Sequence, residues 1–146
     1  DFFKGSFILT YSGLFPSFLY QIKLLDSKHL LVLLLFVWAV DVSSYYLGKA
    51  LGKTPFFPKL SPKKTWEGFL GGLIAGVFIF YLLSGKSILY GVFMVILAVM
   101  GDLFKSFIKR QVGIKDFSHT LGEHGGFVDR FDSLLFVSPF YLWVIR

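Results

Sequence analysis

The chain has 146 residues, of which 55% are hydrophobic, 20% are aromatic and only 16% are charged, and its mean hydropathy is +0.68. This balance leaves too little polar surface for a water-soluble globule, and it excludes intrinsic disorder, a collagen-like fibre and a disulfide-stapled domain. Because the chain has no cysteine, a bound metal would be held by oxygen or imidazole ligands, and we interpret the net charge of +6 as membrane topology rather than nucleic-acid binding.

Five apolar segments predict an all-α integral membrane protein with about five transmembrane helices and polar cytoplasmic loops. They cover residues 5–22, 30–46, 68–83, 87–101 and 133–145. The first is weak, because Pro16 and several serines interrupt it. We treat 1–146 as a single transmembrane domain in which 41–146 carries the motifs and 1–40 is less distinctive. Since the chain opens on Asp1, we expect it to be the C-terminal part of a longer polytopic protein.

Lysine and arginine are distributed unequally between the connections. Those after the second and fourth segments carry Lys49, Lys53, Lys59, Lys63, Lys64, Lys105, Lys109, Arg110 and Lys115. The opposite connections carry only Lys23, Lys28 and Lys86. The positive-inside rule therefore predicts that the first group faces the cytoplasm.

Acidic residues interrupt two of the apolar segments. At the end of the second, Asp41, Ser44 and Tyr45 share one helix face, and Asp41 would meet either a substrate cleft or a structural hydroxyl partner. At the end of the fourth, Asp102, Ser106 and Lys109 form a polar stripe. A buried acid there costs about 2.5 to 3.5 kcal/mol, so Asp102 needs a partner. That partner is a bound cation or, equally, Lys105 or the Ser106 hydroxyl.

The segment 115–132 combines glycines with charged residues. Gly125 and Gly126 allow close backbone approach to a ligand, and the helix that follows would direct its amides at phosphate. Asp129 and Asp132 lie one turn apart on that helix, and carboxylates from two helices suit magnesium. His124 is the histidine that we expect to be functional. The alternative is an ordinary glycine turn with a dipole-favoured acidic helix start.

A third polar segment, 59–68, precedes the third apolar run. Ser61 is a candidate N-cap and Pro62 a first-turn residue, which would put Lys63 and Lys64 at a helix N-terminus, where cations are unfavourable unless an anion binds. Topology alone could also explain the two lysines. Behind them, glycines at 68, 72 and 76 form a small-residue face for close helix packing, which would also allow a homodimer.

These motifs together resemble the signature of the phosphatidate cytidylyltransferases, also called CDP-diacylglycerol synthases. The resemblance covers 41–146, and 1–40 is similar only in being apolar. The matching runs are D-V-S-S-Y-Y-L-G-K from Asp41, S-P-K-K-T-W-E-G from Ser61, S-F-I-K-R from Ser106, K-D-F-S from Lys115 and L-G-E-H-G-G-F-V-D-R-F-D from Leu121.

The resemblance implies transfer of a cytidylyl group from CTP to phosphatidate with magnesium, at the cytoplasmic face of a bacterial inner membrane. It implies no nucleic-acid partner. The residues expected to be catalytic are Asp102, Asp129, Lys109, Arg110 and Asp132. Asp102 and Asp129 would hold the metal, with Asp132 or Asp116 supporting it or a second cation. The residues expected to bind substrate are Asp41, Ser61, Lys63, Lys64, Thr65, Ser106, Lys115, Asp116, His124, Gly125, Gly126 and Arg130.

Three alternatives remain open at this point. A CTP-dependent polyprenol or phytol kinase would transfer the γ-phosphoryl group instead. An ion-coupled transporter would use Asp41 and Asp102 as coupling sites. A structural subunit would use its basic surface only to bind lipid.

Overall fold

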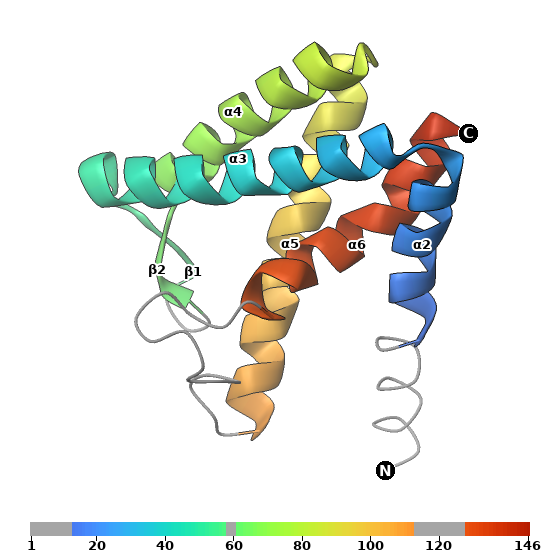
Figure 1. Ribbon diagram of the computed structural model, residues 1–146. Coiled ribbons are helices and arrows are strands. Elements are labelled where there is room, and N and C mark those ends of the chain that lie inside the picture. Colours follow the sequence, from blue (N-terminus) through green and yellow to red (C-terminus); the bar gives the residue numbers. More distant parts are fainter. Residues whose placement is uncertain (1–12, 58–60, 113–127) are drawn as a thin grey trace.

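The computed structural model describes residues 13–57, 61–112 and 128–146, and within them the chain is helical apart from one β-hairpin (Figure 1). Each predicted apolar segment overlaps one helix, and the helices extend beyond the predicted bounds. The helices are α2 (Phe15–Leu25), α3 (Ser27–Leu51), α4 (Trp66–Ser84), α5 (Ile88–Val112) and α6 (Val128–Ile145). The strands β1 (Pro55–Phe57) and β2 (Ser61–Thr65) pair antiparallel between α3 and α4.

Among the described residues, α3 and α4 are the helices long and apolar enough to cross a membrane, with mean hydropathies of 2.0 and 1.7. The apolar helical stretches Ile88–Phe104 and Ser133–Ile145 are shorter. In Figure 1, α3 and α4 run alongside each other, whereas α5 crosses them steeply. The all-α class is thus confirmed, the apolar helices fit a membrane protein, and the number of about five spans stays a prediction.

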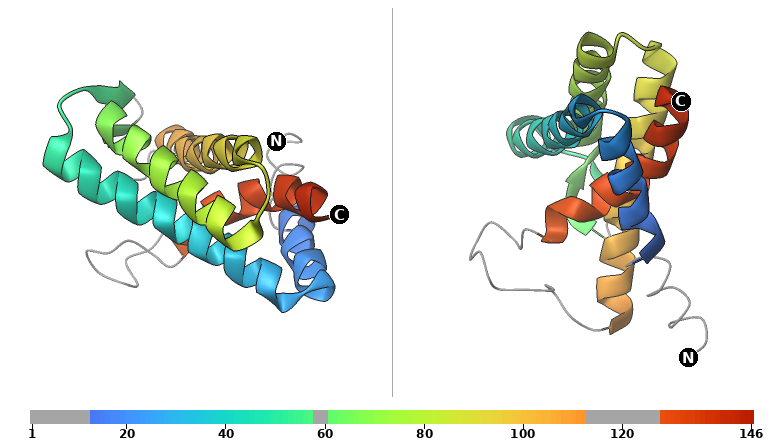
Figure 2. Two further views of the ribbon diagram at one scale, coloured as in Figure 1. Left: turned by 90° about the horizontal axis from the view of Figure 1, so that it is seen from above. Right: turned by 45° about the vertical axis from the view of Figure 1, so that its right-hand side comes forward.

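The glycine face of α4 packs against α3. A Cβ atom added at Gly72 would meet Ser44 Oγ, and one at Gly76 would lie 2.5 Å from Val40 Cγ2. The seen-from-above view in Figure 2 shows the two helices side by side. The predicted packing role is therefore confirmed. Because α3 of the same chain covers this face, a homodimer through these glycines finds no free surface there.

The core lies where α3, α4, α5 and α6 meet. Phe36 and Phe80 contact edge to face at 6.0 Å between ring centroids, and Phe80 contacts Tyr141 at 6.3 Å. All three side chains are buried. Outward-facing side chains are also large and apolar, for example Ile74 and Phe78. An apolar core combined with an apolar exterior is the pattern expected of helices surrounded by lipid.

Helix α6 continues through a proline, Pro139. Pro139 has no N–H and so cannot donate to the carbonyl of Leu135, four residues earlier. The Ser138 hydroxyl donates to that carbonyl instead, at 2.8 Å, and Ser138 is fully buried. The backbone acceptor is thereby satisfied in an apolar environment, where an unpaired carbonyl would cost several kcal/mol.

The hairpin corrects the prediction made for Ser61 and Pro62. Both residues belong to β2, and α4 begins only at Trp66. Its N-cap is Thr65, whose hydroxyl accepts from the Gly68 amide at 3.2 Å. Ser61 is therefore not a helix cap, and Lys63 and Lys64 do not stand at a helix N-terminus. The physical reason is that Pro62 is compatible with an edge strand, and pairing with β1 overrides the local helix signal.

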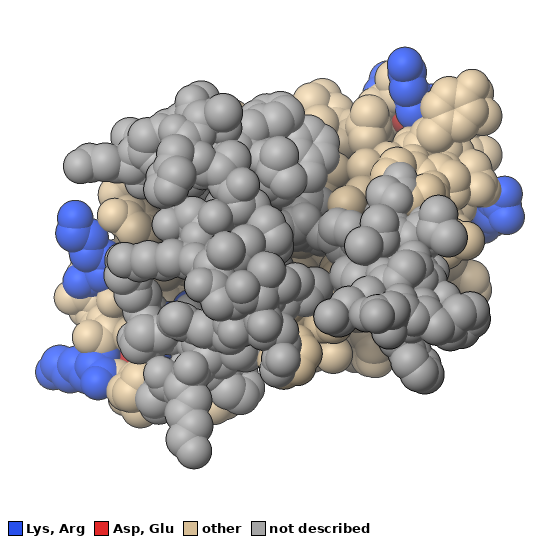
Figure 3. Space-filling view, turned by 90° about the horizontal axis from the view of Figure 1, so that it is seen from below, with Lys and Arg blue, Asp and Glu red and all other residues tan. Residues whose placement is uncertain are grey.

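Charged side chains stand at the ends of the molecule. Figure 3, seen from below, shows Lys and Arg side chains at opposite edges of the view, with uncharged side chains between them where the residues are described. Lys49 lies in the last turn of α3 and Lys53 two residues after its end. Lys23 lies in the last turn of α2, Lys28 in the first turn of α3 and Lys86 two residues after the end of α4. This separation is the charge pattern that the sequence predicted for the connections.

Candidate active site

A cavity of about 630 Å³ lies between α3, the start of α4 and the middle of α5. Its polar lining comes from three separate elements, so the site exists only in the folded chain. The lining residues are Val40, Asp41, Ser44, Tyr45, Gly48, Lys49, Phe56, Lys64, Thr65, Gly68, Phe69, Ala98, Val99 and Asp102.

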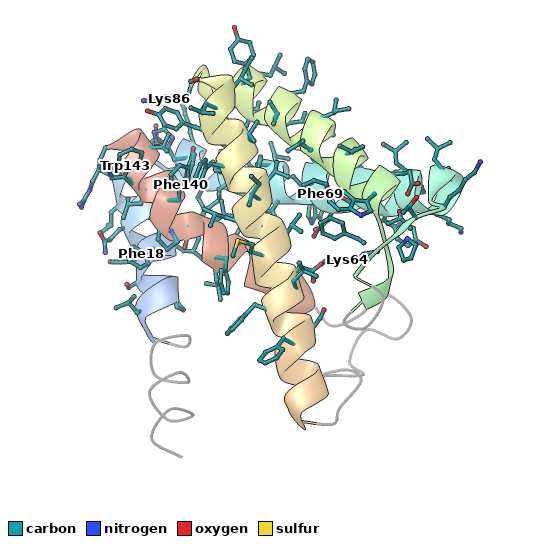
Figure 4. All side chains as sticks on the ribbon, turned by 180° about the vertical axis from the view of Figure 1, so that it is seen from behind. Phe18, Lys64, Phe69, Lys86, Phe140 and Trp143 are labelled. Atoms are coloured by element: carbon teal, nitrogen blue, oxygen red, sulfur yellow. The ribbon has the colours of Figure 1, made fainter. Side chains whose placement is uncertain are left out.

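An ion pair crosses this cavity. The ammonium group of Lys64, from β2, pairs with the carboxylate of Asp102, from α5. Figure 4 shows Lys64 reaching α5, while Lys86 lies at the opposite end of the molecule. The side chains are 28% and 36% exposed, so both charges stay accessible to a ligand that enters the cavity. This geometry joins a cation and an anion that come from two different predicted motifs.

The ion pair gives Asp102 a partner that was not among those predicted from the sequence, and a bound cation at this carboxylate stays a prediction. The Ser106 hydroxyl donates to the backbone carbonyl of Asp102 at 3.0 Å, so Ser106 is not a partner of the carboxylate as the sequence allowed. Lys105 belongs to α5, and its side chain is outside the described part of the chain. A lysine from the hairpin, which local spacing could not indicate, is the partner that the structure provides.

Helix α3 contributes the second carboxylate of the cavity. Asp41 and Ser44 both line it, as their shared helix face predicted, and both are half-buried. Asp41 also has an interaction partner in the protein. The cleft and the structural interpretations of Asp41 are therefore compatible, since the residue faces the cavity and is held in place.

The sequence reasoning missed several contributors to the site. Phe56 and Phe69 line the cavity, and their rings stack at 5.1 Å with an interplanar angle of 14°. Just outside, the carboxylate of Glu67 accepts hydrogen bonds from the amide and hydroxyl of Thr54. Thr65 followed two residues later by Glu67 is a helix-start signal that was present in the sequence.

The remaining predicted residues are placed only in part. Lys115, Asp116, His124, Gly125 and Gly126 lie outside the described residues. Ser61 and Lys63 belong to β2, Lys109 and Arg110 to α5, and Asp129, Arg130 and Asp132 to the first turns of α6, but their side chains are not among those described.

The middle of α6 nevertheless contacts α5 beside Asp102. A Cβ atom on Gly101 would lie 3.0 Å from the Phe136 Cβ, and Phe104 packs on Phe136 with ring centroids 5.5 Å apart. Asp129 precedes Phe136 on α6 by seven residues, or about two helical turns. The two helices that carry the predicted metal ligands are therefore in direct contact next to the cavity.

Apolar helices around a cavity in which lysine meets carboxylate define a predominantly helical protein that fits a membrane setting. The chain belongs to the cytidylyltransferase family, whose model matches residues 1–146. It is 54% identical to a phosphatidate cytidylyltransferase of Aquifex aeolicus over 97% of this chain and 57% of the relative. It is similar to those of Haemophilus influenzae (41%; 80% of this chain, 46% of the relative) and Bacillus subtilis (39%; 75% and 44%). The chain thus spans about half the length of the relatives it matches.

Proposed function

We propose that this chain carries the catalytic site of a phosphatidate cytidylyltransferase, which forms CDP-diacylglycerol and pyrophosphate from CTP and phosphatidate. The observation that carries the proposal is the cavity in which Lys64 of the hairpin meets Asp102 of α5. Membership of the cytidylyltransferase family supports it. A site that joins polyphosphate to a lipid phosphate needs cationic groups for the anions and carboxylates for a counter-ion, next to an apolar environment for the acyl chains.

In the proposed reaction a phosphate oxygen of phosphatidate attacks the α-phosphorus of CTP. The new P–O bond forms in line as the bond to the β-phosphate oxygen breaks, and the electron pair leaves with pyrophosphate. No covalent enzyme intermediate is required, so the protein contributes mainly positioning and neutralisation of charge. Lys64 would bind phosphate in the cavity. Lys63, Lys109, Arg110 and Arg130 are proposed to act with it, as the sequence motifs indicate.

A magnesium ion is part of the proposal. The cavity offers the carboxylates of Asp41 and Asp102, and hard oxygen donors are the ligands that magnesium prefers. Within the described residues no group of three metal-ligating side chains occurs. Asp129 is therefore proposed as a further ligand beside Asp102, with Asp132 or Asp116 in support, and phosphate oxygens would complete the shell. The ion would neutralise the negative charge of the phosphates.

The proposed setting is the bacterial inner membrane, with the cavity at the cytoplasmic face. Lys49, Lys53 and Lys64 lie at the cavity end of the helices, which supports this orientation through the positive-inside rule. Exposed Tyr45 and Trp66 lie at the same end, where amphipathic rings are typical of the membrane interface. The phosphatidate head would reach the cavity while its acyl chains stay among the helices.

Labelled CTP tests the reaction directly. With phosphatidate in vesicles and magnesium, we expect label from the α-phosphate of CTP to enter lipid and label from the γ-phosphate to leave as pyrophosphate. Label from the γ-phosphate in lipid would instead support the kinase alternative. We expect Asp102→Asn to abolish transfer. Asp26→Asn is the same change at the N-terminal end of α3, away from the cavity, and should preserve transfer. Equal activity of the two variants would remove Asp102 from the site.

A further inference from the structure

The β-hairpin is attached to the start of α4 by a carboxylate outside the cavity. The amide of Thr54 donates to Glu67 Oε1 at 3.2 Å, and the hydroxyl of Thr54 donates to the same oxygen at 3.0 Å. The second carboxylate oxygen, Oε2, lies 3.4 Å from the Thr54 amide. One side chain of α4 therefore accepts from both hydrogen-bond donors of the residue that precedes β1, and bonds to an ionised acceptor are the stronger kind.

Backbone bonds continue this attachment to Lys64. The Trp66 amide donates to the Thr54 carbonyl at 3.0 Å, and Pro55 is the pairing partner of Thr65. Phe56 packs edge to face on Trp66, with ring centroids 4.4 Å apart. Lys64 directly precedes Thr65, whose pairing with Pro55 joins β2 to β1. The position of the Lys64 Cα, and hence the region that its ammonium can reach, therefore depends on these bonds of the hairpin.

Glu67 itself does not line the cavity, although it follows Lys64 by only three residues. Its carboxylate accepts from Thr54, whereas the ion pair of the cavity joins Lys64 to Asp102. A contribution of Glu67 to the reaction must therefore pass through the hairpin. A lysine side chain has four rotatable bonds, so its contact with an anion is tight only where the backbone that carries it is held.

We propose that Glu67 is a positioning residue: through its bonds to Thr54 it fixes the hairpin and so holds Lys64 in place to bind a phosphate of the nucleotide. This inference rests on the proposed function, which it deepens by assigning a residue that never touches substrate. Loss of a positioning residue is expected to lower the affinity for substrate, whereas loss of a residue needed only for folding lowers the amount of folded protein. Glu67 is proposed to belong to the first kind.

The kinetic test compares variants of the two hydrogen-bonding partners. We expect Glu67→Ala to raise the KM for CTP by about tenfold, the size of one charge-assisted bond, with kcat changed by less than about twofold. Glu67→Gln and Thr54→Ser keep the hydrogen bonds and should restore most of the affinity, whereas Thr54→Val should not. The double variant Glu67→Ala, Thr54→Val should match Glu67→Ala alone, because Glu67→Ala already removes the hydroxyl bond that Thr54→Val removes, together with the amide bond that Thr54→Val keeps.

The control is Asp26→Asn, a carboxylate at the far end of α3 that accepts from the Lys28 amide. Asparagine caps helices as well as aspartate, so this variant should keep the KM for CTP of the original protein. A drop in kcat at constant KM in Glu67→Ala would indicate a smaller folded fraction and would overturn the positioning role. So would identical kinetics of Glu67→Ala and Asp26→Asn.

A second measurement does not depend on activity. Because the chain has no cysteine, Lys64→Cys with Asp102→Cys gives a unique pair for a short bis-maleimide cross-linker. We expect Glu67→Ala in this background to slow cross-linking several-fold and Asp26→Asn to leave it unchanged. If Glu67→Ala fails to fold, Thr54→Val replaces it. An unchanged cross-linking rate would refute the positioning role even if transfer is confirmed, whereas absent α-label transfer in the original protein would refute only the proposed function.

Discussion

Replacing Lys64 by methionine should separate the stability of the site from its affinity for substrate. The Lys64–Asp102 pair is 28% and 36% exposed, and ion pairs of such exposure contribute about 0.2 to 1 kcal/mol. Methionine keeps most of the apolar stem, so the free energy of unfolding should fall by no more than about 1 kcal/mol. A lysine that binds phosphate contributes more, about 1.5 to 3 kcal/mol, which corresponds to a loss of roughly 10- to 150-fold in CTP affinity.

The assay pairs thermal unfolding in detergent with transfer of α-labelled cytidylyl to lipid. Lys86→Met is the matched control, because Lys86 is exposed at the opposite end of the molecule. We expect both variants to unfold within a few degrees of the original protein and only Lys64→Met to lose CTP affinity. Equal transfer by the two variants would refute the role of Lys64 in substrate binding. A large loss of stability in Lys64→Met would show that the ion pair is structural.

Three further changes test the packing that supports the site. Gly72→Ala forces a Cβ against α3 and should lower stability by about 1 to 3 kcal/mol, whereas Gly13→Ala, with nothing within 4 Å, should be neutral or slightly stabilising in the same unfolding assay. Thr65→Ala removes the cap of α4 and should cost about 1 kcal/mol, with Thr65→Ser restoring it. Ser138→Ala leaves the Leu135 carbonyl without its bond and should cost about 1 to 3 kcal/mol; an unchanged unfolding temperature would contradict that assignment.

The helices could be predicted from the sequence because their signal is local. Uninterrupted apolar runs and glycines at four-residue spacing indicate helices and a packing face without any knowledge of the partner. Their ends were less predictable. Helix α5 continues to Val112, well past the apolar run that ends near Gly101, because polar residues extend a helix beyond the apolar region as readily as they end it.

The hairpin could not be predicted, because its cause is tertiary. Strand β1 has three residues and no alternation, and Ser61 followed by Pro62 resembles a helix start as much as an edge strand. The same limit applies to the ion pair. Asp102 was expected to have a partner because of its depth, but no spacing rule could identify Lys64, which lies on a different element.

Gly68 belongs both to the packing face of α4 and to the lining of the cavity. Gly48 and Gly68 line the cavity, and a Cβ on Gly68 would lie 2.7 Å from the Ser44 carbonyl and 3.0 Å from the Gly48 Cα. Helices α3 and α4 therefore meet backbone to backbone at the cavity wall, which brings Gly48 beside Thr65, the cap of α4: a Cβ on Gly48 would lie 3.2 Å from the Thr65 Oγ1. The three atoms nearest to a Cβ on Gly76, deeper along α4, belong to apolar side chains of α3 and α5, and one of these is Val40, which lines the cavity. A side chain at Gly68 would thus meet the backbone at the cavity wall directly, whereas one at Gly76 would reach the cavity only by displacing Val40.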